Sequence, residues 1–238
     1  MLYTEEAVRG NIRNRDGKRV FFLKKEDTLT PGARDFLTRE RIEIRDAGEA
    51  KIETYHLIGG GEVHEKPEHM THLNGDVLVH KNHPRIAFRG AIDSLEADLL
   101  LCQQMTDEPL KSQVGQVLDL ARQLIRYDVM GEPVPETTLC GLSQQEIRQR
   151  SHFPQEYYAQ PHFMPSAADG MRILMLNRCR CTARSAELAA VSAFADREGN
   201  PTRVDILQAM NRISSMIYIL MIQEKARGTG RKYGETST

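Results

Sequence analysis

From His83 to about residue 226 the chain is a succession of stretches with helical periodicity, and this pattern restricts the fold more than any other feature. Apolar residues recur every three or four positions in 84–105 and 109–130, and more weakly in 142–153. Two longer periodic stretches follow, at about 168–196 and 202–226, separated by "DREGNP" with its glycine and proline. No convincing strand pattern lies among them. Four or five antiparallel helices with short connections predict a mainly α helical bundle.

The first 50 residues have a different character. "RVFFL" (19–23) is rich in strand-forming residues, and "IEIRD" (42–46) alternates like a strand. Between them Thr30 and Pro31 predict the N-cap and the first residue of a helix. We therefore expect four parts, which are a small β/α module at 1–50, a flexible connector at 51–76, the helical bundle at 77–228 and a disordered tail at 229–238.

The charge balance argues against a nucleic-acid or membrane-surface protein. The chain has 32 basic and 33 acidic residues, a net charge of −1, so that its net charge gives no attraction to a polyanion, and only a local basic patch would provide one. No apolar run approaches the ~20 residues of a membrane span, and the first ten residues lack the apolar core of a secretory signal. The four cysteines fit a reducing compartment better than a disulfide scaffold. A cytoplasmic protein is expected.

The stretch "NRCRCTARSAELAAV" (177–191) carries charge on one side of an otherwise apolar helix. At about 100° per residue, Arg180, Arg184 and Glu187 fall within roughly 60° of one another. A charge that is removed from water must be paired or used on a ligand, whereas a solvated charged face is common on helices. The helix alone leaves both interpretations open.

Two other helices carry unusual polar residues. In the first bundle helix one face holds small residues beside Arg85, Arg89, Asp93 and Glu96. Asp93 can therefore meet an arginine of a neighbouring helix or subunit, although an exposed charged face is the alternative. In the last helix Asn211 interrupts a strongly apolar run, so that it is either a satisfied core amide or a ligand contact.

Three motifs in these helices carry a resemblance to a known family. "LVHKNHPRIAFRGAIDSLEADL", "RCTARSAEL" and "MNRISSMIYIL" resemble, in order and spacing, segments of the ATP:corrinoid adenosyltransferases of the propanediol-utilisation type. The N-terminal "TEEAVR" and "LTPGARDFLTRERIEI", with "KPEHMTHL", are similar to the ethanolamine-utilisation branch of these enzymes. The resemblance covers nearly the whole chain.

The resemblance implies a five-helix bundle of the cobalamin adenosyltransferase type that forms a homotrimer or another homo-oligomer, with ATP in the cleft between adjacent subunits and the corrinoid beside it. Cob(I)alamin would attack the 5′ carbon of ATP and expel triphosphate, which gives adenosylcobalamin for ethanolamine ammonia-lyase. Mg²⁺ would accompany ATP, and a flavoprotein or another reductase would supply Co(I). The expected location is the cytoplasm, and the ethanolamine branch points to a bacterial microcompartment within it.

The resemblance also assigns ATP-binding roles to four residues. Arg184 and Lys81 would hold phosphate oxygens, the arginine through its forked geometry and the lysine as a point charge. Glu187, an acceptor when ionised, would bind ribose hydroxyls or orient Arg184. Asn211 would contact the nucleotide.

Three further positions complete the expected site. Arg180 would pair with Asp93 across the subunit interface. These two residues, with Arg184 and Glu187, form the expected catalytic set. Phe163, in "PHFMP", would crowd the lower face of the cobalt, so that the metal loses its lower ligand and becomes reducible.

The chain departs from these families in places that bear on function. "THLNGD" stands where the propanediol type has a Gly/Thr-rich phosphate loop, and Ser215 stands where that type has an aspartate. "KIETYHLIGGGEVHE" lacks the cysteines of the metal motif found in some ethanolamine-type members, and the spacing of nearby histidines fits no standard zinc site. No structural metal is therefore expected.

Other function classes compete with this interpretation. A non-catalytic helical scaffold of a metabolic assembly would keep the Asp93–Arg180 interface, but it has no use for Lys81, Arg184 and Asn211 together. A ferritin-like di-iron bundle needs Glu-x-x-His pairs that the bundle helices lack. A P-loop kinase needs a Gly-x-x-x-x-Gly-Lys-Ser/Thr motif, which is also missing from the sequence.

Overall fold

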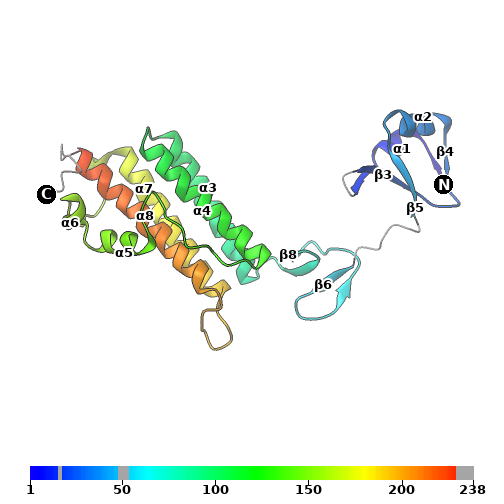
Figure 1. Cartoon of the computed structure of the whole chain (residues 1–238). Coiled ribbons are helices and arrows are strands. Elements are labelled where there is room, and N and C mark those ends of the chain that lie inside the picture. The colour runs from blue at the N-terminus through cyan, green and yellow to red at the C-terminus, as the bar shows by residue number, and fades with distance from the viewer. Residues whose placement is uncertain (16–17, 48–53, 229–238) are drawn as a thin grey trace. The chain divides into compact units, whose positions relative to one another are not determined.

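The computed structural model describes residues 1–15, 18–47 and 54–228, so that the tail expected at 229–238 lies outside the described residues. The chain divides into two compact units (Figure 1). The first consists of Met1–Tyr55 with Glu62–Glu65, and the second of His56–Gly61 with Lys66–Thr238. Each unit is described by itself.

The first unit is a small β/α fold, as the sequence predicted. Strands β2, β3 and β5 form a sheet in that order, with β3 antiparallel to β2 and parallel to β5, while β1 pairs in parallel with β4. Helix α2 begins as expected, because the side chain of Thr30 accepts a hydrogen bond from the backbone N–H of Ala33 and Pro31 follows it. The elements are β1 (Leu2–Tyr3), α1 (Glu5–Arg9), β2 (Arg13–Arg15), β3 (Lys18–Leu23), β4 (Thr28–Leu29), α2 (Pro31–Arg39), β5 (Glu43–Asp46) and β7 (Glu62–Val63).

Short strands lie in the range 51–76, which the sequence analysis treated as a flexible connector. Besides β7, they are β6 (Tyr55–Leu57) and β8 (Met70–Asn74), and β9 (Val77–His80) follows directly. Strand β9 pairs in parallel with β6 and antiparallel with β8. The sequence missed them because strands this short, set among polar residues and glycines, show too little alternation to be recognised. The flexibility of this range and the domain boundaries stay predictions.

The second unit is the predicted helical bundle. Helices α3, α4, α7 and α8 run alongside one another (Figure 1), with α3 packed most extensively against α7 and α7 against α8. One continuous apolar core includes Phe88, Leu124, Leu176 and Ile217, all fully buried. The helices are α3 (Pro84–Gln104), α4 (Leu110–Met130), α5 (Gln144–His152), α6 (Pro154–Tyr158), α7 (Gly170–Ala193) and α8 (Val204–Gly228).

A buried ion pair joins α3 to α4. The side chain of Asp128 is fully buried and accepts hydrogen bonds from Nε of Arg85, at 2.7 Å, and from Nη2 of Arg89, at 2.7 Å. Three of the four charges that the sequence placed on one face of this helix are therefore satisfied inside the chain, because Glu96 also pairs with an arginine of α4. Asp93, one turn after Arg89, is exposed.

The start of α8 is anchored by a second carboxylate. Asp205 accepts from Nε of Arg203 at 2.9 Å and from the backbone N–H of Val134 at 2.9 Å. Arg203 also donates to the backbone oxygen of Glu132, so that the segment after α4 is tied to the first turn of α8. The hydrogen bond from Arg203 is the largest cause that lowers the pKa of Asp205 to about 2.

We expect Asp205→Asn to lower the free energy of unfolding at pH 7 by about 2 kcal/mol. Because the folded pKa of Asp205 lies below its unfolded value, the carboxylate stabilises the fold above that unfolded value. This contribution is lost as the pH falls from about 5 to about 2. In urea unfolding, the free energy of unfolding of the variant should therefore fall less than that of the wild type when the pH is lowered across this window. Asp119→Asn, on the exposed face of α4, is the control, and equal pH dependence of Asp205→Asn and wild type would contradict the assignment.

Candidate active site

A pocket of about 670 Å³ opens between α7, α8, the end of α5 and the segment that follows α6. Its walls include five of the seven residues that the sequence analysis chose, namely Phe163, Arg180, Arg184, Glu187 and Asn211. They come from three segments that are separated in the sequence, and the fold brings them together in one chain.

Helix α7 supplies the charged wall of the pocket. Arg180, Arg184 and Glu187 follow at spacings of four and three, which sets their side chains on one face of a helix. The rotation of α7 is fixed from its other side, where Asp98 of α3 accepts from Nε of Arg178 at 2.7 Å and from the hydroxyl of Thr182 at 2.6 Å. Asp98 is buried, so that breaking these bonds would leave a charge in the core.

The carboxylate of Glu187 is held by α8. Asn211 Nδ2 donates to Glu187 Oε1 at 2.9 Å, and the hydroxyl of Ser214 lies 3.5 Å from Glu187 Oε2. The amide oxygen of Asn211 accepts from Nη1 of Arg212 at 2.9 Å. Asn211 is thus a hydrogen-bonded amide at the pocket surface rather than a core amide, and it presents Glu187 as an acceptor toward the cavity.

Two cations of the pocket lack a carboxylate partner within the described part of the chain. Arg184 is exposed, and its guanidinium makes no hydrogen bond or ion pair there. Arg180 is half-buried, and its guanidinium carbon lies 5.1 Å from the ring centroid of Tyr218. Unpaired guanidinium groups beside a cavity are suited to bind phosphate or carboxylate groups of a ligand.

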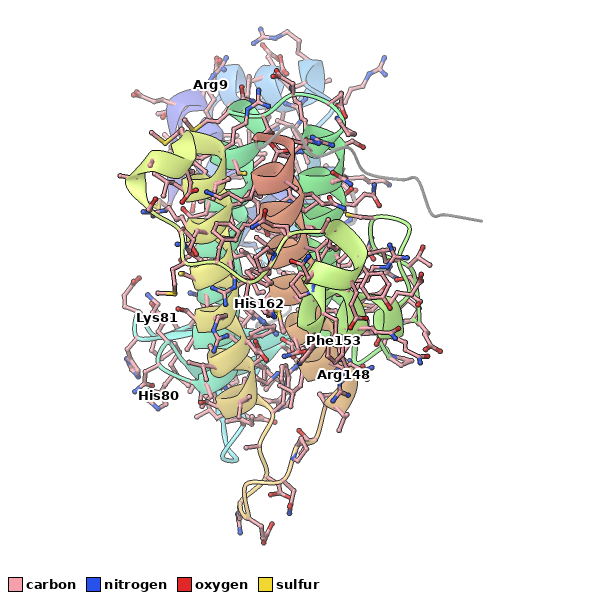
Figure 2. All side chains as sticks on the ribbon, turned by 90° about the vertical axis from the view of Figure 1, so that its left-hand side faces the viewer. Arg9, His80, Lys81, Arg148, Phe153 and His162 are labelled. Carbon is pink, nitrogen blue, oxygen red and sulfur yellow. The ribbon has the colours of Figure 1, made fainter. Side chains whose placement is uncertain are left out.

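Lys81 and Asp93 do not line this pocket. Lys81 is exposed directly after β9, away from His162 in Figure 2, and Asp93 is exposed on α3. The roles that the sequence analysis gave to these two residues stay predictions. Ser215, which replaces an aspartate of the propanediol type, does line the cavity.

Sequence reasoning missed the hydrogen-bonded pair of His162 and Tyr218. Nδ1 of His162 lies 2.7 Å from the hydroxyl of Tyr218, and Figure 2 shows His162 between α7 and α8. Burial is the largest cause that raises the pKa of Tyr218. A signal was present, since Asn211, Tyr218 and Lys225 follow at seven-residue intervals and so share a face of α8.

The described residues contain no group of three or more His, Cys, Asp or Glu side chains placed to hold a metal ion. The rings of His69 and His80 stack at 5.2 Å, which is a pair rather than a ligand set. The expectation that the protein has no structural metal stays a prediction, which activity of the metal-depleted protein would test. In the described residues, no helix has the length and apolar character needed to cross a membrane.

Comparisons with known proteins identify the family. The model of the cobalamin adenosyltransferase family matches residues 63–224. The corrinoid adenosyltransferase EutT of Salmonella typhimurium strain LT2 is 30% identical over 247 residues, which cover 94% of this chain and 92% of that protein. EutT of Escherichia coli K12 is 29% identical over 242 residues, 92% of this chain and 90% of its own length. No solved structure matches the chain. This protein therefore belongs to the cobalamin adenosyltransferase family, which confirms the family and the transferase class predicted from the sequence.

Proposed function

We propose that this protein transfers the 5′-deoxyadenosyl group of ATP to cob(I)alamin in the pocket between α7 and α8. Corrinoid adenosyl transfer is the activity of the family and is named in both relatives. One observation carries the assignment of the site. Arg184, Glu187 and Asn211 line the same cavity, and Arg184 has no ion-pair partner in the described part of the chain.

The chemistry sets the tasks of these residues. The cobalt lone pair forms the bond to the 5′ carbon of ATP, and the carbon–oxygen bond breaks with its electrons leaving on triphosphate. A site for this reaction must hold the ribose and stabilise the charge of the leaving group. We assign the phosphates to Arg184 and the ribose hydroxyls to Glu187, which Asn211 keeps in place.

The part of the pocket that Phe163 lines suits a corrinoid. Phe163 is half-buried there, and Nζ of Lys225 lies 5.5 Å from the centroid of its ring. An aromatic ring held in this way can exclude water and the lower axial ligand from the lower face of cobalt. We propose that Mg²⁺ enters with the nucleotide, bound mainly by phosphate oxygens and water, as is usual for this ion.

We further propose that the site is completed by a second copy of the chain in a trimer. Asp93 is exposed on α3, and Arg180 has no carboxylate partner in the described residues of its own chain. Large apolar side chains are also exposed on the same two helices, namely Leu100 and Leu101 on α3 and Leu188 and Val191 on α7. A neighbouring subunit that covered these side chains would bring Asp93 to Arg180.

The product would serve ethanolamine utilisation, as in the branch that the sequence resembles. The Co(I) state requires an electron donor, and we propose a flavoprotein or another Co(II) reductase as the partner. The proposed location is the cytoplasm, with a microcompartment as the place where the product would be used.

The proposal is tested by an anaerobic assay of metal-depleted protein with chemically reduced cob(I)alamin, ATP and Mg²⁺. We expect a light-sensitive product with the spectrum of adenosylcobalamin, one triphosphate per product, and the same rate as protein that was not treated with chelator. Activity that returned only with Zn²⁺ or Fe²⁺ would instead assign a metal role to the histidines at 56–83. Neither product nor ATP binding would favour the non-catalytic scaffold.

A further inference from the structure

We propose that Tyr218 is a positioning residue of the pocket. Its hydroxyl holds the segment that contains Phe163, and its ring contacts the guanidinium of Arg180. This inference rests on the proposed function, because it concerns how the same site holds its corrinoid. It adds a role for Tyr218 and His162, which the sequence motifs left without one.

The hydroxyl of Tyr218 faces the segment that follows α6. It lies 2.7 Å from Nδ1 of His162, and Nε2 of the same imidazole lies 3.1 Å from the backbone oxygen of His152. A carbonyl oxygen only accepts, so that in the neutral imidazole Nε2 carries the hydrogen, Nδ1 accepts, and the phenol donates to it. The two rings are nearly parallel, at 10°, with centroids 5.7 Å apart.

The next residue in this segment is Phe163, and α8 holds it at two points. Burial raises the pKa of Tyr218, and an interaction of its hydroxyl with the backbone of Phe163 opposes this shift. Two turns further along α8, Lys225 lies over the ring of Phe163 and forms an ion pair with Asp169. The position of the aromatic ring is thus set by two side chains of α8, seven residues apart.

The ring of Tyr218 contacts Arg180, which lines the pocket from α7. The guanidinium carbon of Arg180 lies 5.1 Å from the ring centroid, within the range of a cation–π contact. The same side chain therefore contacts Arg180 through its ring and the segment of Phe163 through its hydroxyl. Removing the hydroxyl should release the segment but leave the ring beneath Arg180 in place.

This division predicts which substrate is affected. Glu187 is held by Asn211 and Ser214, and within the described residues the hydrogen bonds of these two side chains do not involve the hydroxyl of Tyr218, so that we expect the ATP contacts to be independent of it. The corrinoid contacts of Phe163 depend on it. Loss of the hydroxyl should therefore weaken the handling of the corrinoid and leave ATP binding intact.

The experiment compares Tyr218→Phe with the wild type and with Tyr127→Phe in the full-length protein under anaerobic conditions. Tyr127 is a matched control, since its hydroxyl donates to Gln123 on α4 and lies outside the pocket. The readouts are KM for cob(I)alamin, KM for ATP, and the fraction of cob(II)alamin that loses its lower ligand in the presence of ATP, measured by electron paramagnetic resonance. For Tyr218→Phe we expect a change of about fivefold to tenfold in the corrinoid KM and in this fraction, with the ATP KM within about twofold. His162→Ala cuts the same link independently and should act in the same direction.

The outcomes separate the role of Tyr218 from the proposed function. An active wild type with Tyr218→Phe equal to Tyr127→Phe in all three readouts would overturn the inference and leave the proposed function standing. An equal rise in both KM values would also overturn it, because it would indicate a general loss of structure. A wild type that forms no adenosylcobalamin would overturn the proposed function itself.

Discussion

Replacing Arg184 by alanine should weaken ATP binding by about 10- to 100-fold while leaving the fold intact. The guanidinium is exposed and makes no ion pair in the described chain, so that its removal breaks no internal contact. A hydrogen bond to a charged group contributes about 1.5–3 kcal/mol, which corresponds to this range of affinity. The measurement is the Kd for ATP by isothermal titration calorimetry, with thermal unfolding as the check on the fold.

Two variants sharpen this test. Arg172→Ala removes an arginine from the same helix that pairs with Asp107 at the surface and lies outside the pocket, and it should keep the wild-type Kd. Arg184→Lys keeps the charge but loses the forked geometry, so that an intermediate Kd is expected. An unchanged Kd in Arg184→Ala would place the phosphates elsewhere. A change in oligomeric mass would instead give Arg184 the interface role proposed for Arg180.

The long helices were predictable because their burial follows the helical period. The sequence placed two of them at 84–105 and 109–130, and the structure has Pro84–Gln104 and Leu110–Met130. The break before the last helix was marked by its glycine and proline. The strands β6, β8 and β9 escaped because strand patterns of three to five residues cannot be separated from polar connections.

The candidate site was predictable where its residues share one helix. The spacing of Arg180, Arg184 and Glu187 placed them on one face, and the structure places all three at the pocket. Contacts between distant segments were not predictable, because a single sequence does not show which charges meet. The pairing of Tyr218 with His162, 56 residues away, is an example.

The charged face of α3 shows the same limit. From spacing alone Arg85, Arg89 and Asp93 looked like one polar surface. In the structure the two arginines turn to Asp128 of α4, whereas Asp93 stays exposed. Asp128 lies between apolar residues in "LIRYDVM", and a lone carboxylate in such a stretch was the available signal.

We expect Asp128→Ala to lower the free energy of unfolding by about 3–5 kcal/mol, the usual range when one partner of a buried ion pair is removed. The side chain of Asp128 is 0% exposed, and those of Arg85 and Arg89 are 24% and 17% exposed. Neither guanidinium can return fully to water without moving the start of α3. Urea unfolding of the full chain, followed by circular dichroism, measures the loss.

The matched control is Asp119→Ala, since this aspartate lies on the exposed face of the same helix and should change the stability by less than about 0.5 kcal/mol. Asp128→Asn keeps an oxygen acceptor but removes the charge, so that it should fall between alanine and wild type. A loss below about 1 kcal/mol in Asp128→Ala would mean that both arginines find water or another acceptor. Because these arginines and Asp93 lie on one helix, such a rearrangement would also move Asp93, and the variant would then lose the proposed trimer before it lost its fold.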